Sequence, residues 1–328
     1  MMNRRELLRR GGVLAAPAAF APDLLNAESI DYPRPGATIR YVVPFPPGGL
    51  TDVMARQVSQ HLSERWKVTV VVDNKPGGGG QIGADAVAKA PGDGYTLLAI
   101  TLTHAANVTL FPKAPFNLQK DLKPVALLAG SPMLVVVPEA SPIKDFRDLM
   151  ASSRARALNA GSSGNGTPPH LTLALFNQLN RSHIQHVPYK GGAPSMTDLI
   201  GGQIDLVFSN MPESIAHVRS GKLRALAIAS TGRHLLVPEV PTTTEAGMPA
   251  LQVENWTALM APSSMPDAAI QKLSTEVVKI MAAPDVEERA STQGFRVDAR
   301  PWDRFGTFLN AEVVRWAGVV KAADIRPE

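Results

Sequence analysis

The sequence predicts an α/β fold in which parallel β-sheets carry helices on both faces. Short β-branched segments alternate with amphipathic segments along most of the chain, and Gly- and Pro-rich turns separate them. No internal repeat or low-complexity run interrupts the pattern. Strand–helix alternation gives parallel sheets because each crossover between parallel strands passes over a face of the sheet. At 328 residues, the chain is long enough for about two domains.

The predicted elements begin near residue 38. Residues 38–43 (TIRYVV) are typical of a buried strand, and a Pro- and Gly-rich loop ends it. Thr51 is the expected cap of a helix that continues to residue 66. Apolar residues recur at a spacing of four along one face of this helix: Met54, Val58, Leu62 and Trp66.

The same reasoning extends the alternation towards the C-terminus. The further predicted strands are residues 68–72, 95–101, 157–161, 185–188, 204–208 and 223–229. The further predicted helices are residues 81–90, 169–179, 194–200 and 266–281, and a last helix that carries Phe305, Leu309, Trp316 and Val320. Residues 125–137 are apolar and β-rich, but we expect Gly130 and Pro132 to divide them.

Composition excludes several kinds of protein. The chain has 0 Cys, which excludes disulfides, thiolate zinc sites, iron–sulfur clusters and a cysteine nucleophile. A net charge of +4 and an aromatic content of 5% are too low for a nucleic-acid-binding surface. We therefore expect no nucleic-acid partner.

The N-terminus has the order of a secretory signal. Four arginines precede the short apolar run at residues 11–21, and candidate cleavage positions follow at residues 19–21 and 25–27. The run is far shorter than the ~20 residues that span a bilayer. Residues 3–8 (NRRELL) also resemble a twin-arginine signal. We expect residues 1–27 to be a cleaved export signal; the alternative is a disordered basic tail.

Local signatures of catalysis or cofactor binding are weak. Residues 78–83 match G-x-G-x-x-G, but the next predicted strand ends at residues 102–104 without the acidic residue that dinucleotide binding requires. Asn165 replaces the last glycine of a G-x-S-x-G elbow. His183 and His186 would point to opposite faces of a strand, so we expect surface or packing roles for them. We predict neither a metal site nor a cofactor.

Four loops that follow predicted strands are rich in Gly, Ser, Thr and Pro: residues 45–52, 101–104, 161–167 and 189–192. In open α/β sheets, ligands bind at the carboxyl ends of the strands. Glycine lets the backbone approach a ligand, and a helix N-terminus supplies free amides that favour a carboxylate. Two such sheets facing each other would form a cleft bordered by these loops.

At these loops the sequence resembles the Bug receptors, which are TctC-like extracytoplasmic solute-binding proteins of tripartite tricarboxylate transporters. The resemblance runs from residue 39 nearly to the C-terminus. It is carried by VPFPPGGLTD (43–52), DNKPGGGGQIGADAVAKAPGDGYTL (73–97), GSSGNGTPPHL (161–171), HVPYKGGAPSMTDLIGGQID (186–205), GKLRALAIAS (221–230) and VPEVPTTTEAGMP (237–249).

The resemblance implies a type II periplasmic-binding fold with two α/β domains and a hinged ligand cleft. The domains would comprise residues 28–130 with 253–328, and residues 131–252. It also implies a monomeric periplasmic protein, without enzymatic activity, that hands a small carboxylate ligand to membrane permease subunits. The ligand could be an organic acid, a dicarboxylate, an amino acid or an aromatic carboxylate.

The family holds the ligand carboxylate on the loop after the first strand, through backbone amides and ordered waters. Here Gly48 and Gly49 would supply those amides, and Ser209 replaces an Asp that is common in the family. Residues 254–258 (ENWTA) also lack a Gly that is common near residue 258. The ligand-binding residues implied are Phe45, Pro46, Gly48, Gly49, Asp52, Thr103, Ser162, Ser163, Gly166, Thr167, His170, Tyr189, Lys190 and Ser209.

Two other functions stay open at this point. An exported hydrolase would use Ser163 as nucleophile with His104 or His170 as base. A sensory subunit would present the same ligand to a membrane signalling protein rather than to a transporter. Ester turnover would indicate the first alternative, and capture of the membrane partner would distinguish the second.

Overall fold

The computed structural model describes residues 31–327, and from Tyr32 onward they form one compact unit. The predicted export signal and its cleavage positions lie outside the described residues. None of the helices in the described part has both the length and the apolar character needed to cross a membrane.

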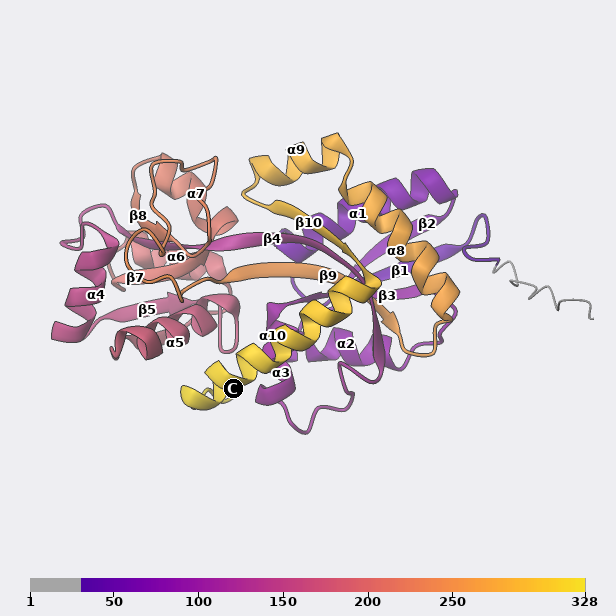
Figure 1. Cartoon of the computed structure of the whole chain (residues 1–328), viewed down its shortest axis with the longest axis horizontal. Helices are drawn as coiled ribbons and strands as arrows, with labels where there is room; N and C mark the ends of the chain where they lie inside the picture. Colours follow the sequence, from indigo (N-terminus) through magenta and orange to yellow (C-terminus); the bar gives the residue numbers. More distant parts are fainter. Residues whose placement is uncertain (1–30, 328) are drawn as a thin grey trace, which may run out of the picture. The chain divides into compact units, whose positions relative to one another are not determined.

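A ten-stranded mixed sheet, in the order β2-β1-β3-β9-β4-β7-β5-β6, forms the centre of the unit, and β8 and β10 also pair with β4 (Figure 1). The long strand β4 (Leu122–Pro138) runs through two sections of the sheet. The first section contains β1 (Thr38–Val43), β2 (Thr69–Asn74), β3 (Thr96–Thr101), β9 (Glu254–Pro262) and β10 (Arg296–Pro301). The second section contains β5 (Asn159–Ser162), β6 (Gln185–Pro188), β7 (Leu206–Asn210) and β8 (Leu223–Ile228).

Parallel pairing occurs where the sequence predicts it. Strands β1, β2 and β3 pair in parallel, as do β5, β6 and β7. Strands β7, β8, β9 and β10 run antiparallel to β4, so the sheet is mixed, whereas the sequence predicted parallel sheets. Residues 254–262 and 296–301, which form β9 and β10, were not predicted as strands.

The prediction that Gly130 and Pro132 divide the apolar run at residues 125–137 is wrong. Strand β4 is continuous, but its partners change at this point: Pro132 pairs with β9, and Met133 pairs with β7. A Cβ atom added at Gly130 would lie 2.4 Å from the Glu254 side chain, which explains why glycine is needed here. The two residues mark the passage between the sheet sections, not a break in the strand.

Helices cover both faces of the sheet. They are α1 (Leu50–Trp66), α2 (Gln81–Ala88), α3 (Leu102–Leu110), α4 (Phe146–Ala155), α5 (Pro168–Asn180), α6 (Gly192–Ile200), α7 (Met211–Arg219), α8 (Asp267–Met281), α9 (Pro284–Thr292) and α10 (Trp302–Ala322), with a short 3₁₀ helix η1 (Gly78–Gly80). Helices α3, α4, α7 and α9 were not predicted. The residue that caps α1 is Gly49, not Thr51, which lies buried in the first turn.

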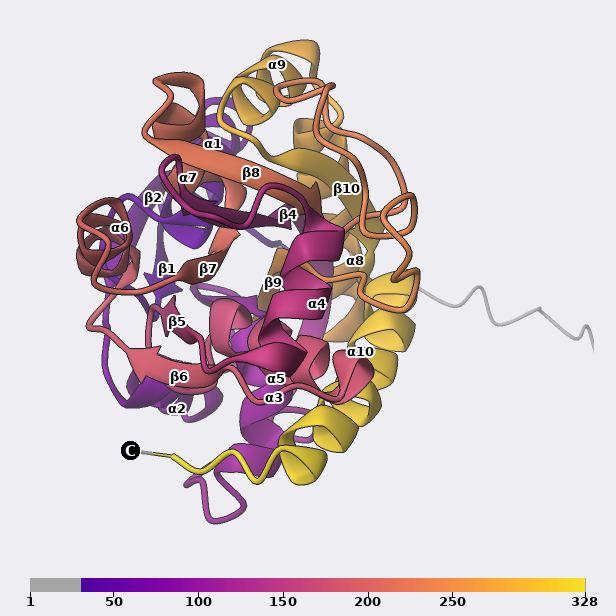
Figure 2. The same ribbon diagram turned by 90° about the vertical axis from the view of Figure 1, so that its left-hand side faces the viewer.

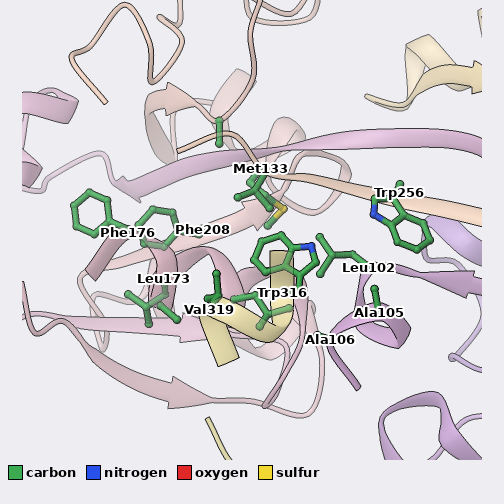
Figure 3. Packing of buried hydrophobic residues seen from close by; sticks show 14 of the residues in the cluster. Leu102, Ala105, Ala106, Met133, Leu173, Phe176, Phe208, Trp256, Trp316 and Val319 are labelled. Carbon is green, nitrogen blue, oxygen red and sulfur yellow. The ribbon is translucent and has the colours of Figure 1, made fainter. Parts of the chain in front are cut away.

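The C-terminal helix α10 packs against both sections of the molecule. It contacts α3 from the first section and α5 from the second, and Figures 1 and 2 both place it beside these helices. One hydrophobic cluster continues from one section to the other. Figure 3 shows Trp316 near its middle, with residues of α3 on one side and Phe176 and Phe208 on the other.

A buried carboxylate ties α10 to the sheet. The indole Nε1 atoms of Trp256 on β9 and Trp316 on α10 both donate to Glu312 Oε2, at 2.8 and 2.9 Å. Because buried polar groups need partners, this arrangement satisfies both indoles and the carboxylate together. Trp256 pairs with Gly130 in the sheet, so α10 is anchored beside the passage between the sections.

Candidate functional site

The loop between β1 and α1 is held in place by Asp52. The Asp52 carboxylate accepts hydrogen bonds from the Gly48 amide at 3.0 Å, from Asn74 Nδ2 at 2.9 Å and from the Arg56 guanidinium. Asn74 Nδ2 also donates to the Phe45 carbonyl at 3.1 Å. Burial alone would raise the pKa of Asp52, but the hydrogen bonds from Arg56, Gly48 and Asn74 outweigh it and lower that pKa.

The side chain of Asp52 is buried beneath the loop and holds it through these hydrogen bonds. Its expected contact with a ligand stays a prediction. The Gly48 amide was expected to bind the ligand carboxylate. In the structure it donates its hydrogen bond to the Asp52 carboxylate instead. Gly48 has φ +91°, a conformation that L side chains rarely adopt, which accounts for glycine at this position.

Free donors remain at the start of α1. Gly49 caps the helix without a side-chain hydrogen bond, and the first-turn amides of Leu50, Thr51 and Asp52 have no partner within the helix. Nothing lies within 4 Å of a Cβ atom built on Gly48 or Gly49, so both glycines border open space. The exposed residue Pro46 belongs to the same loop. The start of α1 therefore combines unpaired donors, partial positive charge and room for an anion.

Helix α3 begins beside this loop, at the end of β3. Thr101 caps α3, and its hydroxyl accepts from the Thr103 amide at 3.2 Å, while His104 Nδ1 accepts from the Thr101 amide at 3.2 Å. The His104 ring meets the Phe45 ring edge to face at 5.7 Å. Burial lowers the pKa of His104 to about 4, so the ring is neutral at pH 7. Thr103 is buried in this turn.

The loop between β5 and α5 satisfies most of its own polar groups. The Gly164 amide donates to Ser162 Oγ at 3.1 Å, and the Gly166 amide donates to His170 Nδ1 at 3.2 Å. Both the amide and the hydroxyl of Thr167 donate to the Gly164 carbonyl. Helix α5 starts with two prolines, which have no N–H groups to offer. Ser163 is half-buried within this loop.

His186 was expected to be a surface or packing residue, and its packing role is confirmed by its stack on His170. The sequence did not predict the polar contact that His186 also makes. Its Nε2 lies 2.6 Å from Ser162 Oγ, and its ring stacks on His170 with centroids 3.6 Å apart and planes 14° from parallel. Burial lowers the pKa of His186 to about 4, and burial together with the neighbouring His186 lowers that of His170 to about 3. His183 is exposed, as expected.

The register of two neighbouring strands, which the sequence alone does not give, explains why His186 reaches Ser162. Strands β5 and β6 pair in parallel, with Ala160 opposite His186. Residues opposite each other point to the same face, and so do residues two apart on one strand. Once this register is known, His186 and Ser162 lie on the same face of the sheet.

The turn after β6 brings Tyr189, another predicted residue, close to Ser162. The Tyr189 amide donates to the Ser162 carbonyl at 3.0 Å, and the Tyr189 hydroxyl donates to Asp198 Oδ2 at 2.7 Å. Burial and then Asp198 raise the pKa of Tyr189 to about 12. Lys190 is exposed, and nothing lies within 4 Å of a Cβ atom built on Gly191.

Ser209 does not join this group as an available donor. It is fully buried on β7, opposite Leu134 of β4, and its hydroxyl donates to the Asn210 carbonyl at 2.9 Å. The expectation of a ligand-facing Ser209 therefore has no support in the geometry.

The two sheet sections meet at Gly166. A Cβ atom built on Gly166 would lie 2.6 Å from Leu110 Cδ1 of α3 and 3.9 Å from Asn107 Oδ1. Asn107 Nδ2 in turn donates to the Gly79 carbonyl at 2.8 Å. The φ of Gly166 is +70°, so both backbone conformation and close packing require glycine. The loop that ends at Thr167 thus lies directly against α3.

A cavity of about 310 Å³ lies near the C-terminal end of α3, and none of the fourteen predicted ligand-binding residues lines it. Its lining contains Asp121 but no Lys or Arg, so it is poorly suited to a carboxylate. The lining residues are Gln81, His104, Asn107, Val108, Phe111, Pro112, Ala114, Pro115, Phe116, Asn117, Leu118 and Asp121. Between residues 31 and 327, no group of three or more His, Asp or Glu is placed to hold a metal ion.

Comparison with known proteins agrees with the family resemblance of the sequence. Residues 54–325 match the family described as "Tripartite tricarboxylate transporter family receptor". Protein BugT from Bordetella pertussis is 36% identical over 328 residues, which cover 98% of each chain. The solved structures that resemble this chain include periplasmic binding proteins, which supports the periplasmic-binding fold.

Two similar structures contain carboxylates. The structure of Rpa4515 from R. palustris with adipate has a TM-score of 0.82 and 32% identity, and the match covers 91% of this chain and 100% of that one. The structure of MatC from Rhodopseudomonas palustris with bound malate has a TM-score of 0.76 and 33% identity, with coverages of 87% and 99%.

Proposed function

The chain belongs to the receptor family of tripartite tricarboxylate transporters, and from that premise we propose that it captures a small carboxylate and delivers it to membrane permease subunits of such a transporter. The ligand would bind between the two sheet sections of the mature, monomeric protein in the periplasm. Similar proteins bound to adipate and to malate support a di- or hydroxycarboxylate as the ligand.

One observation carries the proposal: the start of α1 offers unpaired amides beside open space. A carboxylate placed there would accept charge-assisted hydrogen bonds, each worth about 1.5–3 kcal/mol. Several such bonds, less the cost of ordering ligand and loops, are enough for micromolar binding at about −8 kcal/mol. Because Asp52 already fixes the loop, little of that energy would go into ordering it.

Closure of two domains around the ligand is part of the proposal. The predicted boundaries after residues 130 and 252 stay predictions, and the connections between the sections support them. Strand β4 changes partners at Met133, whose amide donates to the Val253 carbonyl at 3.2 Å; the Val253 amide donates to the Ala229 carbonyl at 2.9 Å. The crossing segments thus lie together, as a hinge requires.

We do not propose hydrolysis. The Nδ1 atoms of His104 and His170 already accept hydrogen bonds from the amides of Thr101 and Gly166. These nitrogens are therefore not available to take a proton from a serine hydroxyl. The observed Ser–His contact involves Ser162, which is fully buried, rather than Ser163. The receptors of this family are solute-binding proteins, and binding without turnover explains the site with fewer assumptions.

Isothermal titration calorimetry with straight-chain dicarboxylates, malate, amino acids and aromatic carboxylates tests the function. We expect at least one acid to bind with micromolar affinity, and its primary amide to bind at least about tenfold more weakly. Gly48→Val should weaken binding about tenfold or more, because it distorts the φ +91° turn.

Gly232→Val is the matched control, since Gly232 also borders open space but has no positive φ. It should bind like the wild type. Failure of every acid to bind, or equal binding of acid and amide, would contradict the proposed function.

A further inference from the structure

Three side chains from three elements meet beneath the loop at residues 162–167. Ser162 ends β5, His186 lies on β6, and His170 lies in the first turn of α5. His186 touches the first residue of the loop and a residue of the helix that follows it: its Nε2 lies 2.6 Å from Ser162 Oγ, and its ring stacks on His170 at 3.6 Å. The first turn of α1, which we propose as the carboxylate site, uses none of these three groups.

The hydrogen bonds define the state of His170. The Gly166 amide donates to His170 Nδ1 at 3.2 Å, so Nδ1 is an acceptor and carries no proton. The neutral ring therefore has its proton on Nε2. An imidazolium has donors at both nitrogens and could not accept from Gly166. The stack on His186 and the burial of the pair favour this neutral form.

Ser162 fixes the other end of the loop. Its Oγ accepts from the Gly164 amide at 3.1 Å and lies 3.1 Å from the Gly164 carbonyl, which also accepts from both donors of Thr167. With His186 Nε2 at 2.6 Å, the buried Ser162 Oγ has three polar neighbours. These contacts hold Ser162 Oγ in place, and Gly164 is held with it.

The position of this loop determines where the two sheet sections touch. Gly166 packs directly on Leu110 of α3, and a Cβ there would clash at 2.6 Å. The contact leaves no room for the loop to shift towards α3. A small displacement of Gly166 would consequently change how closely the sections approach around a ligand.

We propose that His186 is a positioning residue for ligand capture: through Ser162 and His170 it fixes the loop at residues 162–167 against α3. Its purpose rests on the proposed function, but the positioning itself can be measured without a ligand. His186 acts through other residues and touches neither the start of α1 nor its free amides.

The test is amide hydrogen exchange of the ligand-free protein, followed by NMR. In His186→Ala, exchange at Gly164 and Gly166 should accelerate at least about tenfold, while exchange in β1 stays unchanged. His186→Gln, whose side-chain amide can reach Ser162, should restore the protection of Gly164. His183→Ala, an exposed histidine three residues upstream, is the matched control and should exchange like the wild type.

A pair of variants separates the acceptor of His170 from its ring. His170→Phe keeps a ring for stacking but removes the acceptor, so it should expose the Gly166 amide. His170→Asn keeps an acceptor near the Nδ1 position and should protect Gly166 while the stack is lost. Long-range ¹H–¹⁵N spectra of the wild type should show His170 protonated on Nε2 at pH 7.

Adipate is the probe for the functional part. If adipate binds the wild type, His186→Ala should weaken it about tenfold while melting within a few degrees of the wild type. Unchanged exchange at Gly164 and Gly166 in His186→Ala, a His170 proton on Nδ1, or unchanged adipate binding by a variant with faster exchange would overturn the proposal. If no acid binds the wild type, the proposed function fails, and the exchange data still decide the positioning role.

Discussion

The loops before α1 and before α5 have similar compositions, but they differ in how many of their backbone donors are free. Both follow a parallel strand, both are rich in Gly and Pro, and both lead into a helix. The loop before α1 is supported from below by Asp52 and leaves the first-turn amides of the helix free. The loop before α5 uses its own donors internally, and two prolines remove two of the three first-turn amides that its helix could offer. Glycine-rich composition therefore does not identify an anion site; the number of unused donors does.

Removing the support of the first loop should have the largest effect. Asp52→Ala removes the acceptor of the Gly48 amide and one of the two acceptors of Asn74 Nδ2, so the loop loses its fixed shape. We expect about 100-fold weaker carboxylate binding, measured by calorimetry. Unfolding in urea should show about 1–3 kcal/mol lower stability.

Glu64→Ala, on the exposed face of the same helix, is the matched control for Asp52→Ala. It should change neither quantity measurably. If Asp52→Ala binds the acid as the wild type does, the loop needs no support and the comparison between the two loops fails.

The pH dependence of stability tests the buried histidine beside the first loop. His104 has a folded-state pKa of about 4, below its ordinary value of 6.5, so the unfolded chain binds a proton in that interval and the folded chain does not. Stability is then lost as the pH falls from about 6.5 towards 4. His104→Gln keeps an N3 acceptor for the Thr101 amide but does not titrate.

We expect His104→Gln to remove about 2 kcal/mol of the stability loss between pH 7 and pH 4.5. Urea unfolding at both pH values measures it. His183→Gln, at an exposed site, should leave the loss as in the wild type. An equal loss in His104→Gln and the wild type would show that His104 takes up its proton in the folded state.

Features fixed by neighbouring residues could be predicted from the sequence, and features fixed by distant contacts could not. Strand β1 was predicted with its observed limits, because TIRYVV and the Pro-Gly run after it are local signals. The continuity of β4 was missed because Gly130 and Pro132 read locally as breakers. Their reason lies elsewhere: Glu254, from a strand more than a hundred residues away, fills the space beside Gly130.

The same distinction applies to the candidate site. The four loops were located from their composition, since Gly, Pro and hydroxyl residues mark strand ends. Which amides remain free depends on Asp52 and Asn74 for one loop and on His186 for the other, and these contacts follow from tertiary packing and strand register. The resemblance to the Bug receptors supplied the family, which the comparisons confirm, but not these contacts.

A hydroxyl in the second loop should matter less than Asp52. Thr167→Val removes the Oγ1 donor to the Gly164 carbonyl, which still accepts from the Thr167 amide. We expect about 1 kcal/mol lower stability and less than about threefold weaker carboxylate binding. Thr275→Val, where an exposed helical hydroxyl is lost, is the control and should change neither. Loss of binding as large as in Asp52→Ala would mean that the second loop also contacts the ligand directly.

The smallest effect is expected at the start of α5. Pro168→Ala gives the helix one new N–H group at its first position and makes the unfolded chain more flexible. Stability in urea should fall by about 0.5 kcal/mol, and carboxylate affinity should stay within about twofold of the wild type. The reason is that Thr167 and Gly164 already close this end of the loop, so a donor added there faces no ligand. Binding about tenfold tighter in Pro168→Ala would instead show that the start of α5 faces the bound anion, and the two helix starts would then differ only in their number of donors.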